Sequence, residues 1–323
     1  MSSTPAVTVL MPAYNAGRYI HEAVESVLAQ TFTDFQFLII NDGSTDNTAD
    51  ILASFSDPRI EIISRPNKGL IASLNEGLAA ACAPFVARMD ADDVCLPGRL
   101  QVQLDFMLAH PQHVLLGSDV VYTDREGRPI MRINAGGYAD AELRGNFYTK
   151  CPFFHPSVMF RKELVLAVGG YPAGALLFED WLLWKAVMER GQAEVVPEVL
   201  VNMRLNPESV TIDEKWRGPE FAAIRLRSLQ QGYVTEEDAQ RLEEIVRSQD
   251  FRKFKEASYY VLVGKKYLWD NPQPQLARDA FVAALRHYPA QLSTWVLLAA
   301  SFLPAGWMKG LYRRAKKSSS AAS

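Results

Sequence analysis

Three carboxylates in four residues, Asp90-Ala91-Asp92-Asp93, form the segment of this chain best suited to chemistry. Like charges this close raise one another's pKa values unless a cation lies among them. Carboxylate oxygens are ligands that Mg²⁺ and Mn²⁺ prefer, with water and substrate phosphate filling the remaining positions. A solvated acidic turn before a helix near Arg99 is the simpler alternative. The apolar residues 85–87 that lead into the acids favour the metal site.

Two further polar segments could take part in the same chemistry. The segment NDGSTD (41–46) could be only an Asx-turn whose later residues cap a helix, and it lacks the spacing of a calcium loop. Glu179-Asp180 could be only a helix start that the helix macrodipole favours. Each segment alone is weak evidence, so its meaning depends on whether the fold brings all three together.

The pattern in the first half of the chain predicts strands and helices that would bring these segments together. Short β-branched runs alternate with helical patterns, which is typical of a mainly parallel sheet with helices on both faces. The expected strands are residues 7–11, 35–40, 60–63 and 85–89. Ligands bind outside the carboxyl ends of strands in such α/β sheets. The turn at 12–15, Asp42 and the acidic loop should therefore gather along one edge.

The second half predicts a different organisation. Shorter strands and hairpins follow residue 114, with a turn at 124–127 and a strand at 157–160, so the sheet should become mixed. An apolar helix opened by Glu179-Asp180 precedes strand-like residues 195–196 and 199–203, and from about residue 213 the pattern is helical. We therefore expect a catalytic domain at 1–212, a C-terminal helical region at 213–317 and a disordered tail at 318–323.

The ordered set of motifs resembles family 2 glycosyltransferases. The segments that carry the resemblance are VTVLMPAYN (7–15), NDGSTD (41–46), NKG (67–69), MDADD (89–93), HPSVMF (155–160) and ED (179–180). Any one of them is weak, but the set in this order is specific and spans roughly residues 5–212. The resemblance implies the GT-A fold, a single α/β domain around a nucleotide-binding sheet. It also implies an inverting transfer from a nucleotide sugar, for which we expect a UDP-sugar.

The same resemblance implies donor-binding roles for individual residues. Asp92 would bind a divalent metal, Mn²⁺ or Mg²⁺, that bridges the donor diphosphate, with Asp90 toward the ribose or a metal-bound water and Asp93 beside it. Asp42 would accept a hydrogen bond from the uracil ring. The residues expected to line the nucleotide pocket or to add positive charge near it are Pro12, Ala13, Tyr14, Asn15, Arg65 and Lys68.

Asp180 matches the catalytic base of the family. It would take the proton from the acceptor hydroxyl as that oxygen attacks the anomeric carbon from the face opposite the leaving group. The metal would stabilise the departing UDP, and a single displacement inverts the anomeric configuration. Glu179, its neighbour, is a secondary candidate.

Three other positions have more than one interpretation. His155 could act as a base, but in this motif it more often packs beside the acceptor site or bonds to the backbone. Trp181 and Trp184 could stack on a sugar ring, although at helical spacing such residues are more often core. Arg204 resembles an arginine that reaches the diphosphate, but Asn206 stands where many relatives have a histidine.

Composition limits the class of partner. The formal net charge of the 323 residues is -3, so no overall field draws the protein to nucleic acid. Cys82, Cys95 and Cys151 form an odd set without C-x-x-C spacing, which fits a reducing compartment better than a disulfide framework or a zinc site. No segment resembles a signal peptide or the ~20 apolar residues of a membrane span. We expect a cytoplasmic protein.

The end of the chain is basic and aromatic. No acidic residue follows Asp279, and the apolar residues 295–303 precede Lys309, Arg313, Arg314, Lys316 and Lys317. Such a segment can lie in the headgroup region of an anionic membrane. A helix docked on the catalytic domain is an equal alternative. Contact at the inner face of the plasma membrane would suit a glycan or lipid-linked acceptor.

Three other functions make different demands on the sequence. A nucleotide-sugar-binding regulator without turnover would lack the base or a metal acid, and both Asp180 and Asp92 are present. A nucleotidyltransferase should carry a glycine-rich, basic loop after the first strand, where this chain has residues 12–15. A membrane-surface scaffold working through the C-terminal helices need not exclude catalysis. The resemblance implies the type of reaction and leaves the sugar, acceptor and linkage open.

Overall fold

The chain folds into two compact units that do not follow chain order. The computed structural model describes residues 4–133, 138–149, 151–207, 217–248 and 252–303. Unit 1 comprises Met1–Val121, Ile133–Arg204 and Gly218–Val246, and unit 2 comprises Tyr122–Arg132, Leu205–Arg217 and Arg247–Ser323. These units divide the chain differently from a single boundary at residue 212. The tail expected at 318–323 and the basic residues 309–317 lie outside the described residues.

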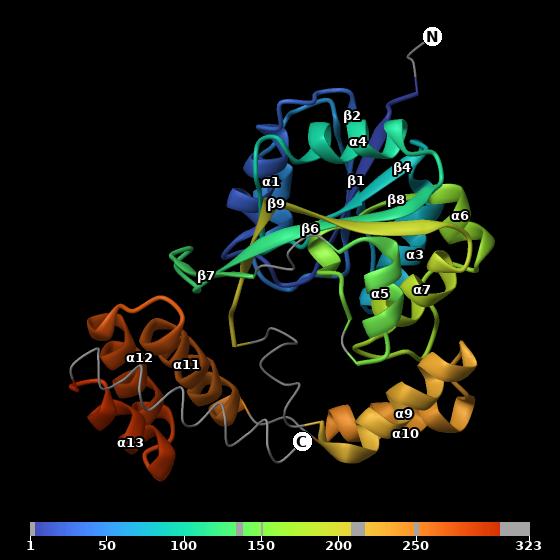
Figure 1. Ribbon diagram of the computed structural model, residues 1–323. Helices are drawn as coiled ribbons and strands as arrows, with labels where there is room; N and C mark the ends of the chain where they lie inside the picture. The colour runs from blue at the N-terminus through green and yellow to red at the C-terminus, as the bar shows by residue number, and fades with distance from the viewer. Residues whose placement is uncertain (1–3, 134–137, 150, 208–216, 249–251, 304–323) are drawn as a thin grey trace. The chain divides into compact units, whose positions relative to one another are not determined.

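Unit 1 is built on a mixed sheet with the strand order β3-β2-β1-β4-β8-β6-β9-β5. Figure 1 labels β1, β2, β4, β6, β8 and β9 of this sheet. Its parallel part consists of β1 (Val7–Ala13), β2 (Phe35–Asn41), β3 (Ile60–Ser64) and β4 (Phe85–Arg88). Its other strands are β5 (Val94–Cys95), β6 (His113–Thr123), β8 (Met159–Arg161) and β9 (Gln192–Arg204). Strand β8 pairs antiparallel with both β4 and β6, which makes the sheet mixed as predicted.

Helices cover both faces of the sheet because its strands are apolar on both sides. The helices on one face are α1 (Ile20–Leu28), α2 (Thr48–Ala53) and α4 (Arg99–Ala109). Those on the other face include α3 (Leu70–Ala80), α5 (Asp140–Asn146), α6 (Lys162–Ala167), α7 (Glu179–Met188), α9 (Gly218–Gln231) and α10 (Glu236–Arg247). Along β1, Val9 and Met11 belong to the first core and Leu10 to the second. This continuous burial is typical of parallel strands covered on both faces.

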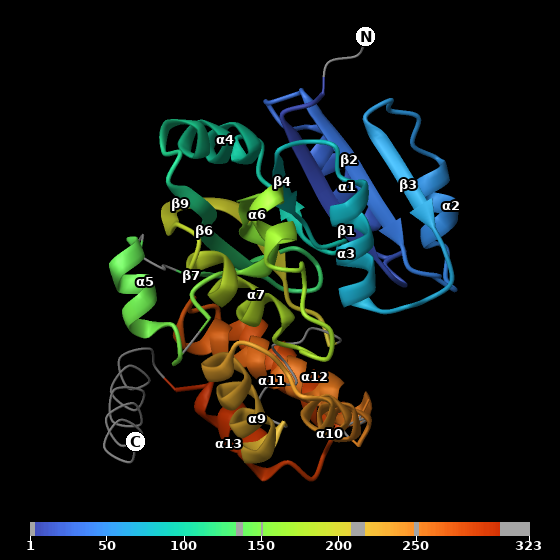
Figure 2. The same cartoon turned by 90° about the vertical axis from the view of Figure 1, so that its right-hand side faces the viewer.

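The parallel register aligns the carboxyl ends of the strands. Ala13 pairs with Asn41, Asn41 pairs with Ser64, and Leu10 pairs with Arg88 near the end of β4. Figure 2 shows these parallel strands side by side. The residues that directly follow the four strand ends are Tyr14, Asp42, Arg65 and Met89. Pro12 and Ala13 are the last residues of β1, where the sequence predicted a turn. Residues 12–15, Asp42 and the acidic loop nevertheless share one edge, as predicted from the sequence.

Two strand predictions differ from the structure. The two strands expected at 195–196 and 199–203 form one strand, β9, that runs through Pro197. Its two halves have different neighbours, since Val195 bridges Tyr138 and Val201 pairs with Cys95. The strand expected at 157–160 begins only at Met159, because η1 (His155–Ser157) forms a 3₁₀ turn with proline in its first turn.

Unit 2 contains a turn and the last helices of the described chain. The predicted turn at 124–127 is present between β6 and β7 (Pro129–Ile133). Asp124 is buried there, and its Oδ2 accepts hydrogen bonds from Tyr267 Oη at 2.8 Å and Arg128 Nε at 2.7 Å. The helices are α11 (Arg252–Trp269), α12 (Pro274–His287) and α13 (Leu292–Ala300), which with α9 and α10 confirm the helical C-terminal region. Within the described ranges, no helix has the length and apolar character needed to cross a membrane.

Gly77 of α3 provides a test of how closely this helix packs on β1. A Cβ atom at Gly77 would lie 2.2 Å from Leu10 Cδ1, and Leu10 is fully buried. Overpacking costs about 1–3 kcal/mol, and the better helix propensity of alanine offsets up to about 1 kcal/mol of this. Gly77→Ala should therefore lower the free energy of unfolding by about 1 kcal/mol in urea titrations. Gly145→Ala in α5 should be neutral or stabilising, because no atom of the described residues outside the nearby backbone of the same helix lies within 4 Å of the added Cβ; equal effects would contradict the tight contact.

Candidate active site

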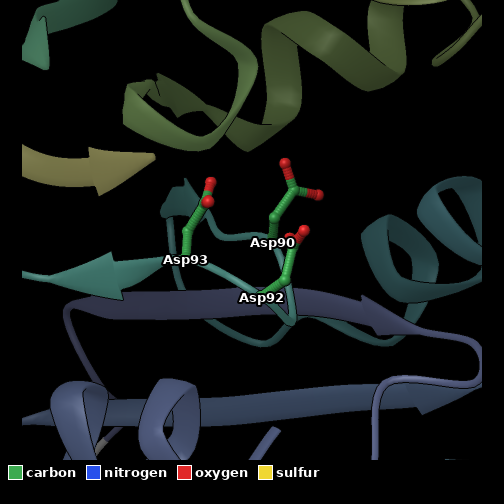
Figure 3. Close-up of side chains that lie close together, drawn as sticks. All are labelled: Asp90, Asp92 and Asp93. Atoms are coloured by element: carbon green, nitrogen blue, oxygen red, sulfur yellow. The ribbon is translucent and has the colours of Figure 1, made fainter. Parts of the chain in front are cut away.

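The loop between β4 and β5 gathers the three acids into one cluster. One carboxylate oxygen from each of Asp90, Asp92 and Asp93 lies within 4.8 Å of the others (Figure 3). Asp93 is buried and the other two are partly buried. Burial raises the pKa of Asp92 to about 7 and that of Asp93 well above its usual value, and repulsion from neighbouring carboxylates adds to both. Hard oxygen ligands that repel one another suit a divalent cation such as Mn²⁺ or Mg²⁺.

Two buried arginines support this loop. The Arg88 guanidinium forms an ion pair with Asp90. Arg99, the first residue of α4, is completely buried, and its Nη2 donates to Arg88 O at 2.7 Å and to Val158 O at 3.2 Å. Arg99 therefore fixes the end of β4 against the segment that precedes β8. The helix start expected near Arg99 is present, and it serves as a brace for the acidic loop.

The second acidic group opens α7. Trp181 N donates to Asp180 Oδ1 at 2.7 Å, as expected of a carboxylate at a helix start. Just before the helix, Leu177 has φ of 68°, a left-handed conformation that costs a non-glycine residue about 1–2 kcal/mol. Packing of the buried residues around it must hold this strained turn, which sets the direction in which α7 begins. Strain of this kind is common at functional sites.

The two carboxyl groups of α7 differ in their protonation. Burial, and to a smaller extent the charge of Asp180, raises the pKa of Glu179 to about 8. Burial also raises the pKa of Asp180, but the Trp181 N–H and the Arg88 charge oppose the rise and leave it at about 6. Near neutral pH the pair therefore carries one proton, mainly on Glu179. Asp180 is the ionised member and the better general base.

His155 is hydrogen-bonded inside the protein. Its Nε2 lies 2.8 Å from Tyr171 Oη. The side chain of Asn75 bonds to both backbone polar groups of Tyr171. Asn75 Oδ1 accepts from Tyr171 N at 2.8 Å, and Asn75 Nδ2 donates to Tyr171 O at 2.9 Å. Burial lowers the pKa of His155 well below its usual value, and the Arg88 charge lowers it further. The imidazole is thus neutral near pH 7 and tied to Tyr171.

The turns after β1 and β2 are joined by hydrogen bonds at the carboxyl edge. Asn15 N donates to Ser44 Oγ at 3.0 Å, and Asn15 Oδ1 accepts from Thr45 N at 2.8 Å. Asn15 has φ of 48°, a conformation that asparagine tolerates. Pro12 and Ala13 are buried, whereas Tyr14 is 53% exposed. Asp46 Oδ1 accepts from Thr48 N at 3.0 Å, so the turn at 41–46 also stabilises the start of α2.

Asp42 organises the loop that follows β3. Its Oδ1 accepts from Lys68 N at 2.8 Å, and its Oδ2 accepts from Gly69 N at 2.9 Å. The buried carboxylate also forms an ion pair with Arg65, which pairs in turn with Glu76. The Arg65 charge is therefore shared with two acids of the protein, and the Lys68 side chain is exposed. Asp42 thus connects β2 to the loop that carries Lys68.

Arg204, the last residue of β9, contacts the acidic loop, because β9 pairs with β5 directly after that loop. Its N donates to Asp93 Oδ1 at 2.7 Å, and its Nε donates to Asp92 O at 2.9 Å. Its Nη2 pairs with Glu22 of α1 at 2.5 Å, and the guanidinium lies 4.7 Å from the centre of the Tyr19 ring. The predicted arginine therefore lies beside the acidic cluster.

Trp181 lies in the core. Its side chain is 6% exposed, its Nε1 donates to Phe147 O at 3.0 Å, and Arg225 covers its ring at 4.9 Å from the centroid. Trp184 is completely buried. The structure therefore places both tryptophans as core residues, the alternative that helical spacing favours.

Sequence reasoning did not identify several residues that contact this site. Arg88 carried a signal, because it is a charged residue at the end of an otherwise apolar strand. Glu22 and Tyr171 come from segments distant in the chain from their partners Arg204 and His155, so the sequence contained no pattern that joins them.

Comparison with known protein sequences identifies the family. A family model described as glycosyl transferase family 2 matches residues 8–169. The amylovoran biosynthesis glycosyltransferase AmsE of Erwinia amylovora is 30% identical over 215 residues, which cover 65% of this chain and 80% of that protein. The putative glycosyltransferase EpsE of Bacillus subtilis is 33% identical over 198 residues, which cover 59% of this chain and 69% of that protein.

Comparison with solved structures identifies the fold. S. aureus TarS 1–349, crystallised with UDP, superposes with a TM-score of 0.55 at 17% identity and covers 94% of this chain and 87% of that one. The mannosyltransferase PcManGT of Pyrobaculum calidifontis, in complex with GDP-Man and Mn²⁺, gives a TM-score of 0.51 at 18% identity and covers 97% and 88%. The GT-A fold implied by the sequence motifs is confirmed. The chain belongs to glycosyl transferase family 2, and it is a glycosyltransferase.

Proposed function

We propose that this enzyme transfers a sugar, with inversion, from a UDP-sugar to a hydroxyl group of a glycan or lipid-linked acceptor. The observation that carries the proposal is the convergence of two acidic groups from distant segments, Asp90 to Asp93 after β4 and Glu179-Asp180 at the start of α7. Arg88, at the end of β4, forms an ion pair with Asp90, and its charge also opposes the rise that burial causes in the pKa of Asp180. Helix α7 is joined to the same strand through η1, since the Trp184 ring lies 6.0 Å from the His155 ring and Val158 O accepts from Arg88 N. One group suits a metal and the other supplies an ionised base.

The names of relatives support a role in cell-surface polysaccharide synthesis. AmsE is named for amylovoran biosynthesis. The hyaluronan synthase of Pasteurella multocida is 27% identical over 214 residues, although the match covers only 22% of that protein. Both proteins are named for making polysaccharides, and we extend that process to this chain.

Asp180 acts as the general base in the proposed reaction. It accepts the proton of the acceptor hydroxyl while that oxygen forms a bond to the anomeric carbon. The bond between the anomeric carbon and the diphosphate oxygen breaks on the opposite face, and its electron pair leaves with UDP. The Trp181 N–H holds Asp180 Oδ1 in place at 2.7 Å, which orients the carboxylate. One displacement inverts the configuration.

Asp92, with Asp90 and Asp93 beside it, would hold the divalent metal. When bound, the metal supplies positive charge that stabilises the diphosphate leaving group. Arg204 adds a fixed positive charge at the same place, since its guanidinium is bonded to the Asp92 carbonyl. Its ion pair with Glu22 orients this charge.

The turns at the carboxyl edge would bind the nucleotide. Tyr14 is exposed there and offers an aromatic face to the base, between the buried Ala13 and the fixed Asn15. A carboxylate oxygen can accept more than one hydrogen bond. Asp42 can therefore bond to Lys68 N and Gly69 N and still accept the N–H of uracil. Arg65 and Lys68 would add positive charge nearby. UDP in the TarS crystal supports this choice of donor.

Two substitutions separate donor binding from transfer. Asp180→Asn should bind UDP with Mn²⁺ almost as well as the wild type, because it removes only the base, while transfer falls by at least about 100-fold. Asp92→Ala should weaken metal-dependent UDP binding by at least about 10-fold. Binding is measured by isothermal titration calorimetry, and transfer by UDP release.

Glu179→Gln is the matched control for the Asp180 variant. Glutamine resembles the protonated form that Glu179 already takes near neutral pH, so this variant should lose far less transfer activity than Asp180→Asn. Normal transfer by Asp180→Asn would show that the base has been assigned wrongly. If the wild type transfers the sugar and Asp180→Asn binds UDP normally but does not transfer it, a regulator that only binds the nucleotide sugar is also excluded.

We also infer that α13 and the basic segment after it contact an anionic membrane, at its cytoplasmic face. Large apolar side chains are exposed on or just after α13: Leu292 at 78%, Trp295 at 51%, Val296 at 68%, Phe302 at 65% and Leu303 at 40%. The sequence then supplies Lys309, Arg313, Arg314, Lys316 and Lys317. Each basic residue near an anionic surface adds about 1 kcal/mol of attraction, and tryptophan suits the headgroup region. A lipid-linked acceptor would lie at the same surface.

Vesicle sedimentation tests this surface. The wild type should pellet with phosphatidylserine vesicles, less with added salt, and little with phosphatidylcholine alone. The double variant Trp295→Ser, Val296→Ser should bind at least about 10-fold more weakly because it loses buried apolar area. Leu108→Ser, which changes an exposed leucine of α4, is the control and should bind like the wild type. If the wild type binds no vesicle and elutes as a dimer in size-exclusion chromatography, a second copy of the chain is the better candidate for the partner that covers α13.

A further inference from the structure

Arg88 is a buried cation inside the acidic site. Arg88 is only 3% exposed. Its backbone is fixed on both sides, because Arg88 N donates to Val158 O at 3.0 Å and Arg88 O accepts from Arg99 Nη2 at 2.7 Å. Its guanidinium forms an ion pair with Asp90. Its Nε, also buried, has no hydrogen-bond partner in the part of the chain that the structure describes.

Arg99 shows how a structural arginine is accommodated at the same end of β4. Its guanidinium donates to the carbonyl oxygens of Arg88 and Val158 and to Gln103 Oε1 at 3.0 Å. Its partners are neutral and hold the loop. Arg88 differs, because its partner is a carboxylate and one of its donors is unused. A buried donor without a partner costs about 1–3 kcal/mol and is rare. Because Arg278 Nε of α12 also has no partner among the described residues, the feature that distinguishes Arg88 is its ion pair with a carboxylate of the acidic cluster.

The charge of Arg88 acts on both acidic groups. Burial raises the pKa values of Asp92 on the loop and of Asp180 on α7, and in both cases the Arg88 charge opposes the rise. It acts in the same direction on Asp93 and Glu179. Packing also connects the two elements, because Arg88 N donates to Val158 O directly after η1, and the His155 ring of η1 lies 6.0 Å from the Trp184 ring of α7.

We propose that Arg88 is a positioning residue that joins the metal-binding loop to the catalytic base. Its ion pair orients Asp90, and its fixed charge lets the loop carboxylates and Asp180 remain close together. This role rests on the proposed function. Arg88 is not assigned contact with the reacting atoms.

This role separates metal binding from turnover. Arg88 and the metal both attract Asp90, so removing the guanidinium removes a competitor and should leave the cation bound at least as tightly. Turnover should fall, because Asp90 loses its orientation and Asp180 loses the cation that favours its ionised form. An arginine that only stabilised the loop would behave differently, since its loss would weaken metal binding and turnover together.

The test compares Arg88→Met, which removes the charge, with Arg88→Lys, which keeps it. Mn²⁺ affinity is measured by electron paramagnetic resonance without donor, and kcat and KM by UDP release from a UDP-sugar. Arg88→Met should bind Mn²⁺ as tightly as the wild type or more tightly. The kcat of Arg88→Met should fall about 100-fold, while its KM for the donor changes by less than about 3-fold. The kcat of Arg88→Lys should be about 10-fold higher than that of Arg88→Met.

Arg161→Lys is the matched control. Arg161 is a partly buried arginine of β8 whose guanidinium donates to His113 O at 2.8 Å and Met107 O at 2.9 Å. It pairs with Phe85, at the opposite end of β4 from the acids. This variant should match the wild type in Mn²⁺ affinity and kcat.

Two results would overturn the role of Arg88. One is a loss of Mn²⁺ affinity in parallel with kcat, and the other is a kcat equal to that of the Arg161 control. If Arg88→Met does not fold, Arg88→Lys is judged by the same two measurements. If the wild type releases no nucleotide from any donor, the proposed function is wrong, whereas weaker Mn²⁺ binding by Arg88→Met would still contradict the role of Arg88.

Discussion

Repulsion among buried carboxylates is the constraint on which the rest of this structure depends. Asp92, Asp93, Glu179 and Asp180 all have raised pKa values, with burial as the largest cause. Gathering such groups is unfavourable unless positive charge lies among them. Arg88 lies within the group and Arg204 beside it. A divalent cation would complete the balance, which explains why a site so unfavourable by itself suits metal-dependent chemistry.

The fold meets this constraint by fixing the backbone around the acids. The parallel register of β1, β2, β3 and β4 brings their carboxyl ends to one edge, and packed cores on both faces hold the strands. Arg99 locks the end of β4, and the strained Leu177 sets the start of α7. The acidic loop is therefore anchored to β4 and β5, and Asp180 stands at the start of a regular helix, which defines the positions of both groups.

The sequence predicted the features that depend on local patterns. Buried apolar runs that end in polar residues predicted β1 to β4, and the acids directly after β4 predicted a cluster of carboxylates at the carboxyl edge. Features that depend on distant contacts were not predictable. These include the continuity of β9 through Pro197, the Glu22–Arg204 ion pair, the His155–Tyr171 hydrogen bond and the inclusion of α9 and α10 in unit 1. Each arises where segments far apart in the chain meet, and no local spacing encodes it.

Thermal unfolding of the wild type with UDP, in Mn²⁺ or in EDTA, tests most directly whether this edge is a metal-dependent nucleotide-sugar site. A ligand that binds only the native state stabilises it by about 2.7 kcal/mol at 100 times its Kd. We expect UDP to raise the melting temperature in Mn²⁺ and to have little effect in EDTA. Stabilisation by a different nucleoside diphosphate would change the assignment of the donor but leave the assignment of the site unchanged. An equal rise in EDTA, or no response to any nucleoside diphosphate with Mn²⁺ or Mg²⁺, would contradict the metal-dependent site.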